Sequence, residues 1–185
     1  MWEVSLGWLL HRKDVKIHNI FSSPEHNYFT REKFDVGDAS TQEHKSIELE
    51  EGKGIKGDRF EFSTYPVTLF SLEVAEAVCQ ELELALDLKL FRRNIIISGV
   101  HLNSLIGEEF TLGRVKFRGL AHCSPCPWMN AVFKKGAYAL MRGRGGLRVE
   151  VLSAGSLESG KVVLESEKEL LEPPLKALKR ASIPS

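Results

Sequence analysis

Two cysteines separated by two residues are the part of this sequence best suited to chemistry. The stretch reads Cys123-Ser-Pro-Cys126-Pro-Trp128, and its prolines limit the backbone conformations that must be fixed to present the thiols. The thiolate is the form of cysteine that attacks electrophiles and binds metals. The local sequence leaves four uses open: metal ligation, a redox disulfide, a persulfide, or packing beneath a loop.

The rest of the chain disfavours two of the familiar uses of such a pair. A structural zinc site needs four ligands, but Cys79 is the only other cysteine, and His122 would supply one ligand at most. A thioredoxin-type dithiol opens a helix within a βαβ unit, and the strand pattern around Cys123 does not supply one. Two kinds of use stay open: a site in which one sulfur acts, and packing of the cysteines beneath a loop.

Two arginines stand at the mouth of a buried strand. Phe91-Arg92-Arg93-Asn94 leads into the apolar run from Ile95 to Val100, which is typical of a strand buried on both faces. Guanidinium groups match phosphate and carboxylate geometry with two hydrogen bonds. The pair either binds an anion or only solvates a rim.

Two more loops carry polar groups that a site could use. His26 and Asn27 follow a strand that ends near Ser22-Ser-Pro24, although a loop histidine is more often only solvated. The glycine-rich loop 52–60 matches the spacing G-x-G-x-x-G, but the residues after it lack helical periodicity, so it does not predict a dinucleotide site. Its Arg59 would suit an anion-facing loop.

The elements expected around these loops are mostly short strands. Alternating or continuous apolar residues predict strands at 15–21, 45–50, 66–70, 95–100, 109–119 (a hairpin), 147–151 and 161–164. One helix is expected over 72–84, with Ser71 as its N-cap and Cys79 on its apolar face; a short helix is expected over 128–135. This pattern favours a β-rich barrel or sandwich.

Composition points to one globular domain without a general attraction for polyanions. The 185 residues are 43% apolar and carry 25 basic and 25 acidic side chains, which argues against nucleic acid as a partner. Three cysteines are too few for a disulfide scaffold, so we predict a cytoplasmic protein. No window reaches the roughly 18 apolar residues of a membrane helix. We expect an extension at 1–14, a domain at 15–165 and a polar tail at 166–185.

A series of motifs, in order along the chain, resembles one known family. The motifs are Ser23-Pro-Glu-His-Asn-Tyr28, Gly52-x-Gly-Ile-x-Gly-Asp58-Arg59, Thr68-Leu-Phe-Ser71, Arg92-Arg-Asn94-Ile, Ser98-Gly99-Val100-x-Leu-Asn-x-Leu-Ile-Gly107, Phe110-x-Leu-Gly113, Cys123-x-Pro-Cys126 and Arg142-Gly-x-Gly-Gly-Leu-Arg148. They resemble the MOSC domain, the C-terminal domain of molybdenum cofactor sulfurase, in its short stand-alone form. Many members read Gly-Asp-Arg-His where this chain has Phe60, so a polar role at position 60 does not transfer.

The resemblance implies a strand-rich barrel, an association with the pterin form of molybdenum cofactor, and one functional cysteine, Cys126. That cysteine would ligate molybdenum, or carry a persulfide received from a pyridoxal-phosphate-dependent cysteine desulfurase. Relatives that hold the metal reduce N-hydroxylated compounds, and electrons would then come from a separate electron-transfer protein, because the chain shows no flavin, haem or iron–sulfur motif.

The motif loops also contain the residues predicted to bind the cofactor. Arginine forks and backbone N–H groups would hold its phosphate, and nearby arginines favour a thiolate. The predicted cofactor-binding residues are Asp58, Arg59, Arg92, Arg93, Asn94, His26 and Asn27, with Arg142 and Arg148 as second candidates. The leading hypothesis is a molybdenum-cofactor-binding oxidoreductase with Cys126 as the metal ligand and Cys123 as a neighbouring thiol. The alternatives are a sulfur carrier and a cofactor-binding module without chemistry.

Overall fold

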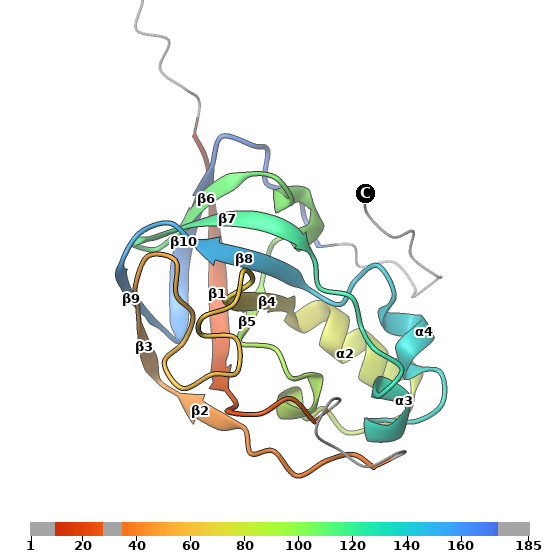
Figure 1. Cartoon of the computed structure of the whole chain (residues 1–185). Coiled ribbons are helices and arrows are strands. Elements are labelled where there is room, and N and C mark those ends of the chain that lie inside the picture. The colour runs from red at the N-terminus through yellow and green to blue at the C-terminus, as the bar shows by residue number, and fades with distance from the viewer. Residues whose placement is uncertain (1–9, 28–34, 174–185) are drawn as a thin grey trace, which may run out of the picture.

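Seven strands close into a barrel around an apolar interior (Figure 1). The computed structural model describes residues 10–27 and 35–173. The barrel strands, in chain order, are β1 (His11–Ser22), β4 (Val67–Ser71), β5 (Ile95–Ser98), β6 (Glu109–Leu112), β7 (Val115–His122), β8 (Leu147–Val151) and β10 (Gly160–Ser166). Neighbours follow the order β10-β6-β7-β8-β4-β5-β1, and β1 pairs back with β10 to close the ring. The predicted β-rich barrel is confirmed.

Three further strands lie outside this ring. β2 (Gln42–His44) extends the sheet beside the end of β1. β3 (Ser46–Leu49) and β9 (Gly155–Glu158) form a separate antiparallel pair. Ile47 and Leu49 of this pair are buried in the barrel core, so the pair covers part of the interior.

Side-chain alternation explains why these segments are strands. In β8 the buried residues Leu147, Val149 and Val151 alternate with the partly exposed Arg148 and Glu150, as expected for a strand with one face in a core. The continuous apolar run of β5 is buried on both faces. Ile95 and Ile97 belong to the barrel interior, whereas Ile96 belongs to a second apolar cluster outside the barrel.

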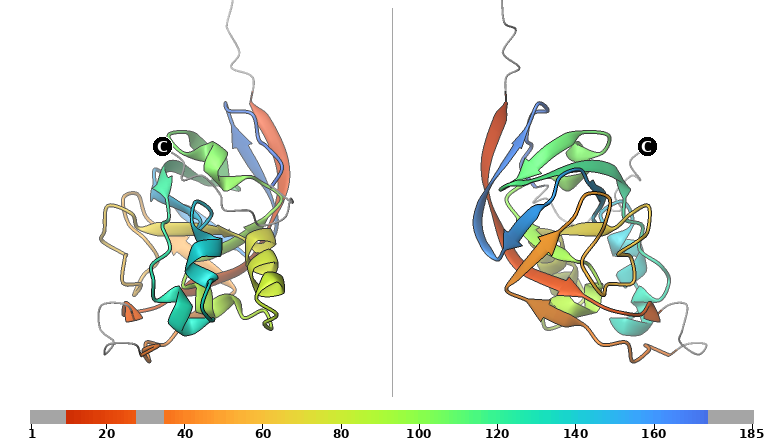
Figure 2. Two further views of the ribbon diagram at one scale, coloured as in Figure 1. Left: turned by 90° about the vertical axis from the view of Figure 1, so that its right-hand side faces the viewer. Right: turned by 60° about the vertical axis from the view of Figure 1, so that its left-hand side comes forward.

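Three short helices cover one side of the barrel and enclose that second cluster (Figure 2). They are α2 (Leu72–Glu81), α3 (Met129–Val132) and α4 (Ala137–Met141), and the 3-10 turns are Leu88–Phe91 and Leu102–Leu105. Ser71 caps α2 as predicted, since its hydroxyl accepts a hydrogen bond from the backbone N–H of Val74 at 3.2 Å. Cys79 is 3% exposed in the cluster, which confirms its predicted place in the core.

The structure differs from the sequence-based expectation at several boundaries. β1 begins at His11, so four residues expected in an N-terminal extension pair with β10. The helix expected over 128–135 is the single turn α3 and is followed by α4, which was not predicted. The parallel pair β4 and β5 makes one βαβ unit with α2, but the cysteine pair lies elsewhere, after β7. The residue bounds of the proposed extension, domain and tail stay a prediction.

Among the described residues, none of the helices has the length and apolar character needed to cross a membrane.

Candidate functional site

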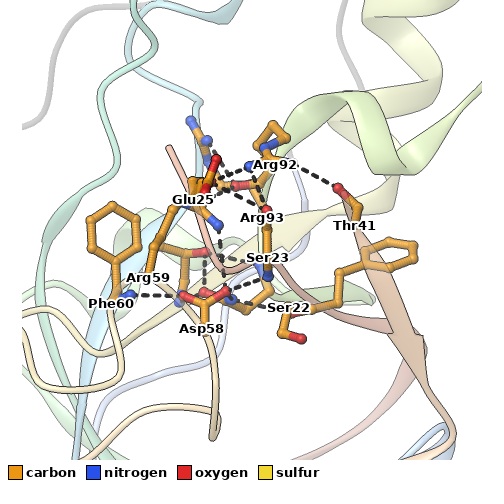
Figure 3. A network of polar contacts seen from close by, with 12 residues as sticks. Ser22, Ser23, Glu25, Thr41, Asp58, Arg59, Phe60, Arg92 and Arg93 are labelled. Carbon is orange, nitrogen blue, oxygen red and sulfur yellow. Dashed lines mark hydrogen bonds and ion pairs between the residues drawn. The ribbon is translucent and has the colours of Figure 1, made fainter. Parts of the chain in front are cut away.

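A buried carboxylate, Asp58, joins three segments near one end of the barrel (Figure 3). Its Oδ2 accepts hydrogen bonds from the backbone N–H of Ser23 at 2.9 Å and from Asn94 Nδ2 at 3.2 Å. Its Oδ1 accepts from the backbone N–H of Phe60 at 3.0 Å, and Arg59 Nη1 lies 3.4 Å from Oδ2. Every one of these partners is a donor, so the geometry suits the ionised carboxylate.

Asn94 lies beneath the same site and is 1% exposed. Its Oδ1 accepts from the backbone N–H and the hydroxyl of Thr68, at 3.0 and 2.8 Å. Its Nδ2 donates to the carbonyl of Phe21 at 3.1 Å as well as to Asp58. Asn94 therefore ties β1, β4 and the start of β5 together, and its amide has no spare group for a ligand.

The guanidinium of Arg92 stabilises the neighbouring loops by hydrogen bonds. Its guanidinium donates to the carbonyls of Ala39 and Glu25 and to the hydroxyls of Thr41 and Ser23, at 2.6–3.0 Å. Its backbone is left-handed, with φ of 57°. Burial, followed by the charge of Arg59, lowers the pKa of Arg92 to about 10. Because its guanidinium already donates four hydrogen bonds to the protein, Arg92 contributes its positive charge to the site and has few donors left for a ligand.

Arg59 and Arg93 keep donors available. Arg59 Nη2 donates to the Arg92 carbonyl at 3.0 Å, but its Nε is buried and has no hydrogen-bond partner in the described parts of the chain. Burial is the main cause that lowers the pKa of Arg59. Arg93 donates from Nε to the Gly145 carbonyl at 2.8 Å and from Nη1 to the Phe91 carbonyl at 2.9 Å. An unpaired buried N–H is costly unless a ligand accepts it.

A glycine turn fixes the cysteine loop close to Arg93. The N–H of Cys123 donates to the Gly146 carbonyl at 2.6 Å. A Cβ atom on Gly145 would lie 2.1 Å from the Cys123 carbonyl oxygen, so only glycine permits this approach. The Gly145 carbonyl also accepts the hydrogen bond from Arg93. The glycines of the Arg142-Gly-x-Gly-Gly-Leu-Arg148 motif thus support the cysteine loop.

These groups surround a cavity of about 260 Å³. It is lined by His26, Asn27, Arg59, Phe60, Tyr65, Thr68, Arg92, Arg93, Cys123, Ser124, Cys126, Trp128, Met129 and Arg148. Cys126 is partly exposed, whereas Cys123 is 6% exposed. Of the two thiols, Cys126 is the one better placed to meet a ligand.

The pKa of Cys126 is raised, contrary to the expectation that nearby arginines favour its thiolate. Burial raises the pKa, and the opposing effects of the Trp128 backbone N–H and of the Arg93 charge are smaller. Desolvation disfavours the charged form of a thiol and here outweighs one guanidinium. Cys126 is a thiol near neutral pH, and an electrophilic ligand such as a metal would have to displace its proton.

His26 and Asn27 face the same cavity. Burial, and then the charges of Arg59, Arg92 and Arg93, lower the pKa of His26 to about 4, so its imidazole is neutral near pH 7. The ring meets Phe60 edge-on, with centroids 5.9 Å apart. Asn27 is 7% exposed, and its Oδ1 accepts from the backbone N–H of Ala39 at 2.8 Å.

The structure brings most of the predicted site residues together. Eight line the cavity: Cys123, Cys126, Arg59, Arg92, Arg93, His26, Asn27 and Arg148. Asp58 and Asn94 lie behind it as supports, and Arg142, at the end of α4, is not among its lining residues.

Sequence reasoning missed part of the cavity wall, namely Phe60, Tyr65, Thr68, Trp128 and Met129. Trp128 is the last residue of the cysteine stretch and Met129 follows it, and this position next to the thiols was a signal that would have included both. Thr68 begins a motif that was recognised but not assigned to the site. Tyr65 carries no such signal.

The cavity does not contain a complete protein-only metal site. Across residues 10–27 and 35–173, no three His, Cys, Asp or Glu side chains gather as metal ligands would. A metal held by Cys126 would therefore need most of its ligands from a cofactor or from solvent.

Comparison with known proteins decides the family. The model of the MOSC domain matches residues 53–164, which include all but the first residue of the glycine-rich loop, both arginines before β5 and the cysteine pair. The chain belongs to the MOSC domain family. MOSC domains are associated with the molybdenum cofactor. A search of curated protein sequences gave no match.

Solved structures share the fold of this MOSC chain at low sequence identity. The YuaD protein from Bacillus subtilis is 14% identical, with a TM-score of 0.67, over 87% of this chain and 100% of that one. YiiM from Escherichia coli is 16% identical, with a TM-score of 0.57, over 91% and 76%. YiiM from Geobacillus stearothermophilus is 14% identical, with a TM-score of 0.57, over 85% and 75%. At these identities the likeness concerns the fold.

Proposed function

We propose that this MOSC protein binds the molybdenum cofactor and is an oxidoreductase acting on N-hydroxylated or similar small molecules, with Cys126 as the molybdenum ligand. The observation that carries the proposal is the partly exposed Cys126 thiol in a cavity shared with Arg59 and Arg93. A soft sulfur ligand beside two cations suits a metal held in an anionic, sulfur-rich cofactor.

The donor set of the cavity fits such a group. The cofactor carries a phosphate, and the buried, unpartnered Nε of Arg59 is a donor that a phosphate oxygen would satisfy. Arg93 adds a second guanidinium, fixed by the Gly145 and Phe91 carbonyls. The described residues gather no full ligand set for a bare metal ion, which agrees with a metal that arrives in its own dithiolene.

When bound, the molybdenum cofactor supplies two-electron chemistry at a sulfur-ligated metal. Reduction of an N–OH group to N–H consumes two electrons and two protons and releases water, so the protein needs an electron-transfer partner. Its own residues bind and orient the substrate. Trp128, Met129 and Phe60 give the cavity an apolar wall that excludes water, and neutral His26 adds no positive charge at neutral pH.

The test is the molybdenum and pterin content of the protein expressed in a host that makes the cofactor. Wild type is expected to carry stoichiometric molybdenum and Cys126→Ala to lose it. Cys79→Ala is the matched control, because Cys79 is a buried thiol in α2 outside the cavity. Equal molybdenum in wild type and Cys126→Ala, or none in wild type, would contradict the proposal.

The partial exposure of Cys126 also favours a second candidate, a sulfur carrier loaded by a pyridoxal-phosphate-dependent cysteine desulfurase. The raised pKa of Cys126 makes its thiolate scarce at neutral pH and so slows sulfur acceptance. Mass spectrometry after incubation with desulfurase and cysteine would show one added sulfur on Cys126. A persulfide that appears equally in Cys126→Ala would exclude this cysteine as the carrier.

A further inference from the structure

Arg148 lines the cavity from β8, whereas Arg92 and Arg93 precede β5. It projects from β8 at a position paired with Thr68 of β4 and Ala121 of β7. Arg148 lines the same cavity as Arg59, Arg92 and Arg93. The cavity therefore has a guanidinium from β8 in addition to those three.

The guanidinium of Arg148 stacks on the ring of Tyr65, and its N–H groups donate no hydrogen bond to the described residues. Its Cζ lies 4.7 Å from the centroid of the Tyr65 ring, and both side chains line the cavity. Within the described ranges, no carboxylate pairs with it and no acceptor receives its N–H groups. Stacking on an aromatic face leaves the N–H groups, which lie in the guanidinium plane, available for an anion.

The register of the sheet places Arg148 a short step from the cysteine loop. Its partner Ala121 precedes Cys123 by two residues, or about 7 Å at the rise of an extended strand. Arg148 and both cysteines line the same cavity, so a ligand bound there can meet the guanidinium and the cysteine loop. In the cofactor-free protein the cavity, at about 260 Å³, has room for a substituted benzene ring, since roughly 150 Å³ accommodates benzene.

We infer that Arg148, stacked on Tyr65, is a substrate subsite that binds the carboxylate of a planar N-hydroxylated compound and directs its N–OH group toward Cys126. The assignment to substrate rests on the proposed function, whereas the selectivity for an anion does not. The cofactor's phosphate would be bound by Arg59, whose buried Nε has no partner among the described residues, and by Arg93, which lines the same cavity. Arg148 is thereby left for a second anion, in another molecule.

The experiment compares two ligands of one shape in binding, by titration calorimetry on the full chain. The ligands are 4-carboxybenzamidoxime and its neutral isostere 4-carbamoylbenzamidoxime, each titrated into cofactor-loaded and cofactor-free protein. Wild type is expected to prefer the carboxylate by about tenfold or more, the range of a charge-assisted hydrogen bond. Arg148→Gln is expected to abolish the preference, and Arg148→Lys to keep part of it.

Arg114→Gln is the matched control, because Arg114 is exposed in the turn between β6 and β7, at the end of β7 remote from the cysteine loop. It should keep the wild-type preference. The inference is overturned if wild type binds neither ligand, if it shows no preference, or if Arg148→Gln keeps the preference. A preference lost in Arg59→Gln but kept in Arg148→Gln would also overturn it, since the anion would then lie beside Cys126.

This outcome is separable from that of the proposed function. Carboxylate preference in a protein that never acquires molybdenum would leave the Arg148 anion subsite standing and contradict the oxidoreductase. Molybdenum bound through Cys126 in a protein without carboxylate preference would support the proposed function and contradict the Arg148 subsite.

Discussion

The thiol of Cys126 shares its cavity with arginines and nevertheless has a raised pKa, because burial outweighs the charge of Arg93. This balance has a chemical consequence. A free thiolate at neutral pH would react with any electrophile that entered the cavity, whereas a protonated thiol reacts slowly. Ligation to a metal is then the event that removes the proton, and the cavity protects the sulfur until the ligand arrives.

Alkylation of Cys126 tests this balance. With iodoacetamide the rate should rise with pH and still be rising at the ordinary thiol value of 9.0, since the pKa of Cys126 lies above it. Arg93 stabilises the thiolate, so Arg93→Gln should raise the pKa further and slow alkylation at any pH below it. Peptide mass spectrometry follows the reaction at this one cysteine. Equal rates in Arg93→Gln and Arg114→Gln would show that the charge of Arg93 does not reach the sulfur.

Asp58 is a second residue whose charge matters, since all its partners donate to it and its side chain is fully buried. In Asp58→Asn, one amide NH₂ must face the donors of Ser23 and Asn94 or that of Phe60, and Arg59 loses its counter-charge. We expect the free energy of unfolding to fall by about 3 kcal/mol, measured by urea denaturation. Asp14→Asn, an exposed position on β1, should change little. Equal effects of the two substitutions would contradict the role given to Asp58.

At the scale of elements, sequence periodicity found most of the strands and the chemistry-bearing loops between them. β8 and β5 were predictable because side-chain alternation and continuous apolarity follow directly from one-face and two-face burial. β2 and β9, of three and four residues, are too short to show a period. The single turn α3 and the following α4 depend on packing against the outer cluster, for which local sequence carries no clear signal.

The same limit applies to the site. Arg59, Arg93 and Cys126 were recognisable from their motifs, but the part each plays depends on contacts across the barrel. Arg92 resembled an anion ligand and proves to be occupied by four protein acceptors. Local sequence could not show which arginine keeps its donors.

The glycine turn that supports the cysteine loop provides a test at this scale. Gly145→Ala would place Cβ 2.1 Å from the Cys123 carbonyl oxygen and 3.2 Å from the Pro125 ring, so the two loops must separate. We expect a loss of roughly 1–3 kcal/mol in unfolding free energy and a changed alkylation rate at Cys126. In the control Gly155→Ala the nearest atom is a Val115 methyl at 3.0 Å, remote from the cysteine loop. An unchanged Cys126 in Gly145→Ala would show that the turn does not position the thiol.

At the scale of the whole molecule, the barrel closes only when two distant parts of the chain meet. β1 pairs with β10 from His11 opposite Ser166 to Ile17 opposite Gly160, so the last barrel strand completes the ring with the first. Ser23, the residue directly after β1, binds Asp58 and Arg92. Closure of the barrel and order in the site are therefore linked through one strand.

A chain that begins at Val15 tests this link, because it keeps the domain expected from sequence but lacks four residues of β1. His11 to Asp14 pair with Val163 to Ser166, and their loss leaves that stretch of β10 without its β1 partner at the closing seam. We expect the shortened chain to lose about 2 kcal/mol of stability, which lowers the Tm by about 4–8 °C for a protein of this size. Calorimetry of the full and shortened chains measures the difference. Because β1 leads into Ser23 of the site, loss of the β1–β10 pairs should also make the cavity less ordered. The shortened chain should therefore retain less molybdenum than wild type. Equal Tm values would mean that closure depends on the pairs from Val15 onward, and that the boundary read from the sequence is the functional one.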